Sequence, residues 1–328
     1  MINGYRVSDV ITFQGRCDAS GGFALDKLHW VGGDDEKNKL LLYSVSGGVG
    51  ELALDFLGLA EDEEADRESA TRVGSVAYWI GSHSAKTDGT KQPGRRRIFA
   101  VEVSGTGASF KITPTGRPFA RLIESLDADP QYAEFHLSAA AERGSNLEGA
   151  LSIESLCASS SDELLIGFRN PIPAGTALIA VVRNPGAMIK GDEPEFGPPL
   201  RLDLDGLGIR DMTRWREGYL LIGGDFRDGD EPGARMSRLF FWDGNAKAPE
   251  ELDVTFPHHF NPEALVLLPG GDGERVLVCS DDGGFACTED GTVCKKLKKD
   301  RKQERRFRTC WLESRTDGPD ANSASAAQ

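Results

Sequence analysis

An acidic residue recurs at a similar place upstream of several short apolar segments. Each of these acids lies 12 to 16 residues before a small residue that ends such a segment, and the clearest examples are Glu68, Glu154, Asp211 and Glu263. Carboxylates that share a partly enclosed space repel one another, and a cation, protonation or pairing with Arg must relieve the repulsion. Oxygen-rich sites suit hard cations such as Ca²⁺. We therefore predict that Glu68, Glu154 and Glu263 hold Ca²⁺ or another divalent cation.

A polar cluster follows each apolar segment and supplies the other candidate residues. His83 and Arg169 depart from the pattern, because most of the equivalent positions carry Asp. A departure from a repeat needs a local reason, and a ligand is one. We interpret His83, Arg169 and Asp211 as catalytic, with His83 exchanging protons and Arg169 binding an anionic substrate group. The residues expected to bind substrate are Arg210, Asp225, Asp281 and Asp282, with Asp34 and Asp35 beside them.

The apolar segments themselves form a repeat. They span 28–35, 77–84, 164–170, 220–226 and 276–283, and the residues aligned within them are spaced by 49, 86, 56 and 56 positions. Further short apolar runs follow most of them, so each unit of roughly fifty residues contains about four short strands. This pattern is typical of β-propeller blades. We predict an all-β fold, a single β-propeller of about five or six four-stranded blades within residues 1–313.

Three segments fall outside the repeat. Residues 117–149 have the pattern of helix and loop and are predicted to be an insertion between blades 2 and 3. Residues 314–328 are small and polar, and we expect them to be disordered. The last blade lacks an obvious closing strand, for which 307–313 and 9–15 are the candidates. A strand from the other terminus would close the ring without open edges.

This fold would bring the candidate residues together. Each acid begins the innermost strand of a blade, and each polar cluster ends the next strand. Neighbouring antiparallel strands place these two positions at the same end of the sheet, so all five blades would contribute to one mouth of the central channel. A structural role is the alternative, because propeller acids often accept backbone N–H bonds from the next blade.

Charge and hydropathy restrict the partners. Asp and Glu number 52 against 38 Lys and Arg, which gives a net charge of −14. An acidic chain is a poor partner for nucleic acid or an anionic membrane. The basic run 295–308 is interpreted as a solvated helix or loop. We see neither a signal peptide nor an apolar stretch of spanning length. The expected partner is a small-molecule ligand or a protein bound at the channel mouth.

The six cysteines are widely scattered and form no CxxC pair. Most lie in apolar, strand-like contexts, where free Cys behaves as a small hydrophobic residue. We expect reduced thiols and a cytoplasmic location.

The series DRESATR to YWIGSHS, SIESLC to LLIGFRNP, GIRDM to LLIGG, NPEALV to VCSDDG and RRFRTCWLE resembles an uncharacterised bacterial propeller family, domain of unknown function 3616. The resemblance extends from about Cys17 to Trp311. The family's acid motifs typically carry Gly after the acid, where this chain has Ser69, Ser155 and Ala264. The resemblance implies the propeller fold and no activity. Similar acid-before-strand patterns occur in phytase-like esterases and calcium-dependent lactonases, an analogy of fold only.

Two functions from different classes remain open. The first is a divalent-metal-assisted hydrolase of a small phosphoester, ester or lactone. The second is a non-catalytic propeller that binds a peptide or protein across the same face.

Overall fold

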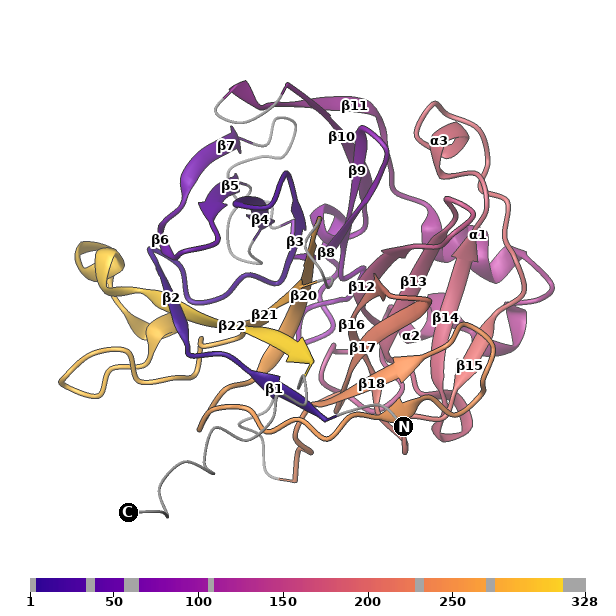
Figure 1. The fold of residues 1–328 in the computed structure, drawn as a ribbon. Coiled ribbons are helices and arrows are strands. Elements are labelled where there is room, and N and C mark those ends of the chain that lie inside the picture. The colour runs from indigo at the N-terminus through magenta and orange to yellow at the C-terminus, as the bar shows by residue number, and fades with distance from the viewer. Residues whose placement is uncertain are drawn as a thin grey trace, which may run out of the picture.

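The computed structural model describes residues 4–33, 39–55, 65–105, 109–227, 233–269 and 275–314. Five antiparallel sheets stand around a central axis as propeller blades (Figure 1). Four blades follow the chain from the innermost strand outward. Blade 1 is β3(Gly21–Ala24)-β4(His29–Gly33)-β5(Lys39–Ser44)-β7(Glu51–Asp55), and blade 2 is β8(Arg67–Val73)-β9(Val76–Gly81)-β10(Ile98–Ser104)-β11(Lys111–Phe119). Blade 3 is β12(Ser152–Ala158)-β13(Leu164–Asn170)-β14(Ala177–Val182)-β15(Leu200–Leu202), and blade 4 is β16(Gly208–Trp215)-β17(Gly218–Gly224)-β18(Arg238–Trp242)-β19(Glu250–Glu251). The predicted all-β propeller is confirmed, with five blades.

The fifth blade is built from both termini. Its strands are β20(Pro262–Leu268), β21(Arg275–Ser280), β22(Arg306–Ser314) and the N-terminal β2(Ile11–Gln14), with β1(Tyr5–Val7) paired to β22 and β6(Gly48–Val49) paired to β2. Both segments proposed as closing strands are therefore used. An aromatic cluster fixes this closure, because Phe13 of β2 stacks on Phe307 of β22 with ring centroids 5.0 Å apart, and both rings are fully buried.

The five inner strands pack against one another around the axis, in the ring order β3, β8, β12, β16, β20. Small residues allow this close approach. A side chain at Gly21 would place its Cβ only 2.6 Å from the Cα of Ser69 in the next blade. Large apolar side chains fill the space between blades, among them the fully buried Trp30, Trp79 and Phe168.

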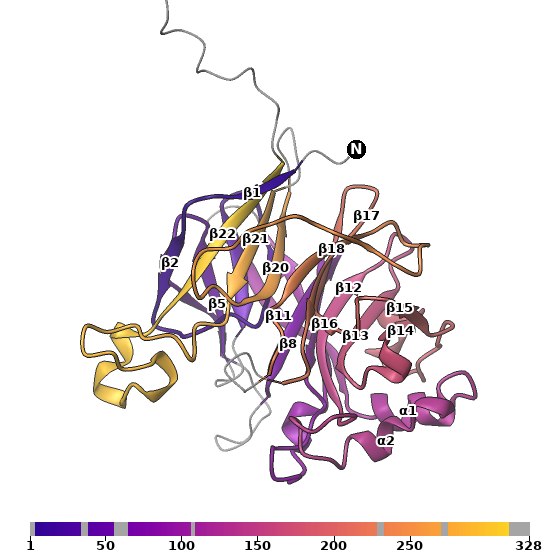
Figure 2. The same ribbon diagram turned by 90° about the horizontal axis from the view of Figure 1, so that it is seen from below.

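The segment between blades 2 and 3 is largely helical, as predicted for the insertion. It contains α1(Leu122–Ala128), η3(Ala133–Phe135) and α2(Leu137–Ala140). The first residues of the predicted insertion, up to Phe119, instead belong to strand β11. The remaining short helices are η1(Pro93–Arg95), η4(Pro173–Gly175), α3(Pro185–Met188), η5(Cys294–Lys296) and η6(Lys299–Glu304). Figure 2 shows α1 and α2 at the same lower end of the ring as the segment that precedes β22.

Tyr132 anchors this helical segment to blade 3. Its ring is fully buried, and its hydroxyl donates to the Gly197 carbonyl at 2.8 Å and accepts from the Val181 amide at 3.1 Å. Burial raises the pKa of Tyr132 to about 12, so the hydroxyl keeps its proton.

Tyr132→Phe should lower the free energy of unfolding by about 1–3 kcal/mol, because two buried backbone groups lose their partner. Urea denaturation measures the change. Tyr78→Phe is the matched control, since the Tyr78 hydroxyl makes no hydrogen bond to the described residues. Its effect should stay within about 0.5 kcal/mol. Equal losses in the two variants would contradict the anchoring role.

One expectation from the sequence is wrong here, and another is confirmed only in part. Cys17 and Cys294 form a disulfide across a sequence separation of 277 residues, while Cys157, Cys279, Cys287 and Cys310 are free and buried. The basic run 295–308 is not simply a solvated helix or loop. Its C-terminal part is the start of β22, and Arg305 and Phe307 within it are buried. The apolar residues from Phe307 onward form the strand that completes the last blade. Their pairing in the sheet outweighs the preference of the charged residues around them for a solvated loop.

Residue Ser314 ends β22; the rest of the tail that was predicted to be disordered lies outside the described residues. Within the described part of the chain, no helix is both long and apolar enough to cross a lipid bilayer.

Candidate functional site

Four of the five inner strands begin with a β-bulge at the same end of the ring. The register slips by one residue between Arg67 and Ser69, between Ile153 and Ser155, between Ile209 and Asp211, and between Pro262 and Ala264. The extra residue of a bulge lies outside the ladder and can be aimed away from it. The bulged residues are Glu68, Glu154, Arg210 and Glu263.

The fourth blade therefore differs from the prediction. Asp211 was aligned with the other three acids, but the bulged position of that blade belongs to Arg210. A cation thus takes the place where three other blades carry a carboxylate. Its position depends on close packing, because a Cβ on Gly224 would lie 2.6 Å from both Cγ and Cδ of Arg210.

A buried ion-pair network joins these residues across three blades. The guanidinium of Arg169, at the end of β13, contacts Oε1 of Glu154 at 2.6 Å. Arg210 contacts Oε2 of Glu154 at 3.4 Å and Oε1 of Glu263 at 2.9 Å. The side chains of Glu154, Arg169 and Arg210 are all less than 10% exposed. The predicted carboxylate repulsion is therefore relieved by Arg pairing, one of the three routes considered.

Several polar atoms of this network have no hydrogen-bond partner among the residues that the structure describes. They are Oε2 of Glu154, Nε of Arg210 and Oε2 of Glu263, all buried. Nε of Arg210 and Oε2 of Glu154 lie near each other without meeting hydrogen-bond geometry. Most buried polar atoms in proteins are satisfied by protein or by ordered water. Such a cluster of unsatisfied atoms leaves donors and acceptors for another molecule.

Glu263 and Asp281 are titratable neighbours with opposite behaviour. Burial and the charge of Asp281 raise the pKa of Glu263 to about 8, against the opposing effects of Arg210 and Lys295. Burial acts in the same direction on Asp281, but Lys295 and Arg210 more than offset it, so the pKa of Asp281 is lowered. At neutral pH Glu263 is therefore mostly a neutral acid, whereas Asp281 is a carboxylate.

Asp211, which was interpreted as catalytic, connects its own blade to two others. Its Oδ2 accepts a 2.7 Å hydrogen bond from the Leu265 amide of blade 5, and its Oδ1 lies 2.8 Å from the Ser69 hydroxyl of blade 2. Burial raises the pKa of Asp211 to about 8, although these hydrogen bonds oppose the shift. This is the structural role that was weighed as the alternative for the repeated acids.

The other predicted acids are also engaged. For Asp225, burial acts to raise the pKa, but hydrogen bonds from Arg227 and the Arg235 amide lower it to about 2. Asp282 accepts from the Arg308 guanidinium at 2.7 and 2.8 Å and from the Ser280 hydroxyl at 2.8 Å. Burial nonetheless raises the pKa of Asp282. Both residues lie at this end of the ring and hold loops in place.

His83 is fully buried, so a ligand could touch it only after its cover moved. Its Nδ1 lies 2.8 Å from the Gly81 carbonyl, and no group in the described part of the chain forms a hydrogen bond with its Nε2. Burial lowers the pKa of His83 to about 4, which keeps the imidazole neutral at physiological pH. The backbone of His83 has a φ of 55°, a conformation that is uncommon for a residue with a Cβ.

The predicted cation ligands do not come together as a bare carboxylate cluster. Glu68 is half-buried at its bulge, while Glu154 and Glu263 are paired with Arg residues. Within the described residues, no group of three or more His, Cys, Asp or Glu side chains is arranged to hold a metal ion. Asp34 and Asp35, which were expected nearby, lie outside the described residues.

Sequence reasoning missed two participants, Lys295 and Ser69. Lys295 was grouped with the basic run, and nothing in its spacing indicates that its Nζ lies 3.9 Å from Asp281. Ser69 was noted only as a replacement for Gly. A hydroxyl in place of the family's usual Gly was the signal that could have indicated a partner for a buried acid.

Several solved structures align with this chain at low sequence identity. The glutaminyl cyclase of Myxococcus xanthus aligns with 11% identity and a TM-score of 0.47, over 95% of this chain and 99% of that one. The PQQ-bound aldose sugar dehydrogenase of Streptomyces coelicolor gives 11% and 0.47, over 95% and 98%. The Malassezia sympodialis allergen Mala s 1 gives 9% and 0.48, over 95% and 98%. No curated protein sequence matches the chain.

The match at the level of sequence families agrees with the resemblance noted above. The model of the family described as "Protein of unknown function (DUF3616)" matches residues 102–276, which is just over half of the chain. The matched region runs from β10 to the start of β21 and includes Glu154, Arg169, Arg210 and Glu263. The chain belongs to the DUF3616 family of proteins of unknown function.

Proposed function

We propose that this end of the propeller binds a small molecule with an anionic or strongly polar oxygen and hydrolyses it, the substrate being a small phosphoester, ester or lactone. The observation that carries the proposal is the cluster of unsatisfied buried atoms on Glu154, Arg210 and Glu263. A ligand oxygen that accepts from Arg210 and from a protonated Glu263 would satisfy two of these residues at once.

The charges around this cluster suit an anionic group. Arg169 and Arg210 bring two permanent positive charges into a space where Glu263 is largely neutral at pH 7. Charge-assisted hydrogen bonds from guanidinium groups are stronger than neutral ones, and more so when water is excluded. Developing negative charge on a substrate oxygen would be stabilised by the same groups.

Glu263 and Asp281 provide the acid–base pair that hydrolysis requires. Two carboxyl groups whose pKa values are pushed apart can act as proton donor and proton acceptor. The Asp281 amide donates to the Asn261 carbonyl at 2.9 Å, which ties Asp281 to the segment that leads into Glu263. Glu263 would protonate the leaving oxygen, and Asp281 would receive the proton of the attacking water.

The divalent cation predicted from the sequence stays a proposal. Glu154 and Glu263 could coordinate a cation only where a guanidinium moved away, so no step of the reaction is assigned to a metal. The cytoplasmic location also stays a prediction, and the disulfide removes one of its two grounds.

A binding scaffold for a peptide or protein is the second candidate. The interblade hydrogen bonds of Asp211 favour it, because they give one of the repeated acids a purely structural task.

The first test is thermal unfolding of metal-stripped protein with inorganic phosphate and, separately, with Ca²⁺, Mg²⁺, Mn²⁺ and Zn²⁺. A ligand that binds only the folded state stabilises it by about 2.7 kcal/mol at a concentration of 100 Kd. We expect phosphate to raise the midpoint of the wild type, and the effect to be lost in Arg169→Met. A rise with a single cation would restore the metal proposal.

The second test is hydrolysis of chromogenic phosphoesters, esters and lactones. Glu263→Gln removes the proton donor with little change in shape and should reduce turnover at least about 100-fold, the usual range for a general acid. Glu134→Gln, an exposed substitution in the helical segment, is the matched control. If the wild type shows neither ligand binding nor hydrolysis, the hydrolase proposal is overturned and the binding scaffold remains.

A further inference from the structure

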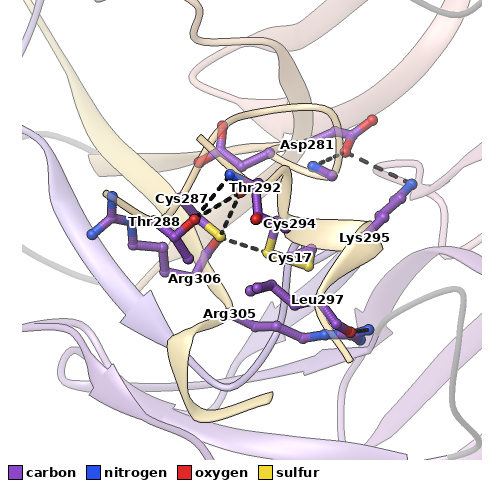
Figure 3. The surroundings of a disulfide bond; sticks show 12 residues. Cys17, Asp281, Cys287, Thr288, Thr292, Cys294, Lys295, Leu297, Arg305 and Arg306 are labelled. Carbon is purple, nitrogen blue, oxygen red and sulfur yellow. Dashed lines mark hydrogen bonds and ion pairs between the residues drawn. A yellow bond between two sulfur atoms is a disulfide. The ribbon is translucent and has the colours of Figure 1, made fainter. Parts of the chain in front are cut away.

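The Cys17–Cys294 disulfide joins the first and last parts of the chain beside the candidate site. Cys17 lies four residues before β3, and Cys294 begins η5, in the long connection between β21 and β22. Leu297 and the free Cys287 pack with them in one small apolar cluster (Figure 3). The disulfide is thus a covalent tie between the N-terminal segment and the connection 281–305.

This connection has little regular structure of its own. Its backbone bonds include those from Cys294 to the Phe285 carbonyl at 3.0 Å and from Lys295 to the Gly283 carbonyl at 3.0 Å, and a single β-bridge joins Ala286 to Val293. The Asp282 amide donates to the Cys17 carbonyl at 3.0 Å, next to the disulfide. The connection is held by turns, this β-bridge and the short helices η5 and η6. A segment outside the sheet ladders opens at a lower free energy than the blades do.

Lys295, the residue after Cys294, reaches back toward the channel mouth. Its side chain lies across Gly283, where a Cβ would be only 2.1 Å from Cε of Lys295. Its Nζ lies 3.9 Å from Oδ1 of Asp281, as Figure 3 shows. The position of Cys294 therefore largely sets the position of Lys295.

The charge of Lys295 acts on the acid–base pair. Lys295 is the largest influence that lowers the pKa of Asp281, and it also opposes the raised pKa of Glu263. Moving Lys295 away would make both carboxyl groups harder to ionise. The disulfide is in this way connected to the charge of the candidate site through one intervening side chain.

The sulfur cluster borders an open depression on its outer side. Cys287 lines an open depression of about 560 Å³ together with Thr288, Asp290 and Arg301. Cys17 and Cys294 are themselves 3% and 0% exposed. A small reductant would approach the disulfide through this depression, past Cys287.

We propose that the Cys17–Cys294 disulfide is a redox latch that holds Lys295 beside Asp281 at the channel mouth. A dithiol opens the latch. The S–S bond breaks, each sulfur takes up one hydrogen, and the dithiol loses two electrons and two protons to become a disulfide. The connection 281–305 then loses its covalent tie, and Lys295 leaves Asp281. Any effect of the latch on hydrolysis rests on the proposed function, whereas the positioning of Lys295 by the disulfide does not require a ligand.

The test is quantitative acetylation of Lys295 in the full-length protein by an N-hydroxysuccinimide ester, followed by peptide mass spectrometry. Oxidised and dithiothreitol-reduced protein are compared, with Lys111 of β11 in the second blade as the internal reference. We expect the Lys295 rate to rise severalfold on reduction, and the Cys17→Ser/Cys294→Ser double variant to show the fast rate without reductant. The rate at the exposed Lys111 should stay constant, which shows that the reagent acts equally in the two samples.

Cys287→Ser is the matched control. It removes a thiol from the same cluster and leaves the disulfide, so its Lys295 should react slowly until reductant is added. A peptide map of non-reduced protein with free thiols at positions 17 and 294 would overturn the proposal. So would an unchanged Lys295 rate after reduction that mass spectrometry has verified. Neither outcome depends on whether phosphate binds, so the latch and the proposed function can fail separately.

Discussion

Arg210→Met is expected to lower the free energy of unfolding by about 3–5 kcal/mol, because Glu154 and Glu263 both lose a buried guanidinium and Glu154 keeps only Arg169 as a charged partner. Arg210 touches Glu154 at 3.4 Å and Glu263 at 2.9 Å, and its own side chain is only 7% exposed. Burial acts to lower the pKa of Arg210, but the two glutamates raise it, so the group is charged. Met keeps an unbranched apolar stem and lacks the guanidinium group with its charge and donors.

Chemical denaturation at pH 7 measures this loss. Lys91→Met is the matched control, since Lys91 pairs with Glu142 at 2.8 Å where both side chains are more than half exposed. Exposed pairs contribute about 0–1 kcal/mol. A loss of similar size in both variants would show that the buried network contributes no more than a surface pair does, and the candidate site would lose its electrostatic basis.

The fold could be predicted because it is encoded locally and repeatedly. Each blade contains an apolar strand that ends at a small residue, and the requirement for a closed ring then assigns the leftover termini to the last blade. Phe307 and Phe13 illustrate this, since both belong to apolar runs that fit no other blade. The gathering of acids and polar residues at one end follows from antiparallel geometry alone.

The composition of the site could be predicted only in part, because a β-bulge shifts the register by one residue. Asp211 has the residue type of its counterparts, but Arg210 has their position. The spacing in fact fits Arg210, which lies 13 residues before Gly223, the offset that also separates Glu68 from Gly81 and Glu154 from Gly167. The longer connection between β20 and β21 gives Glu263 an offset of 16, so the offset of 12 for Asp211 did not stand out. Side-chain type therefore favoured the wrong neighbour.

Contacts between distant segments were beyond the sequence for a different reason. The pairing of Cys17 with Cys294 and the approach of Lys295 to Asp281 depend on where irregular connections lie after the ring has closed. No periodicity constrains such segments, so neither burial nor a partner can be assigned from local pattern.

Asp211→Asn should make the protein more stable than the wild type at pH 8 and above. The pKa of Asp211 is about 8 in the folded state against 3.8 for a free side chain, so the folded protein holds a proton that the unfolded chain releases. The stability from this group is complete below about pH 4 and is lost as the pH rises toward 8. Each pH unit in this window lowers the free energy of unfolding by up to about 1.4 kcal/mol for one such group. Asn does not titrate in this pH range, so the variant does not lose this part of the stability.

The amide also fits the two hydrogen bonds. Its oxygen can accept from the Leu265 amide, and its nitrogen can donate to the Ser69 hydroxyl. That hydroxyl donates to Asp211 in the wild type and would turn its proton toward the Leu156 carbonyl, 3.5 Å away. Denaturation from pH 4 to 9 should give a shallower decline for Asp211→Asn than for the wild type, with a remaining slope from Glu263, whose pKa is also raised to about 8. Asp253→Asn makes the same change on the surface and should reproduce the wild-type profile. A parallel decline in Asp211→Asn would mean that Asp211 is ionised in the folded protein. Asp211 would then accept its hydrogen bonds from blades 2 and 5 as a buried, charged carboxylate.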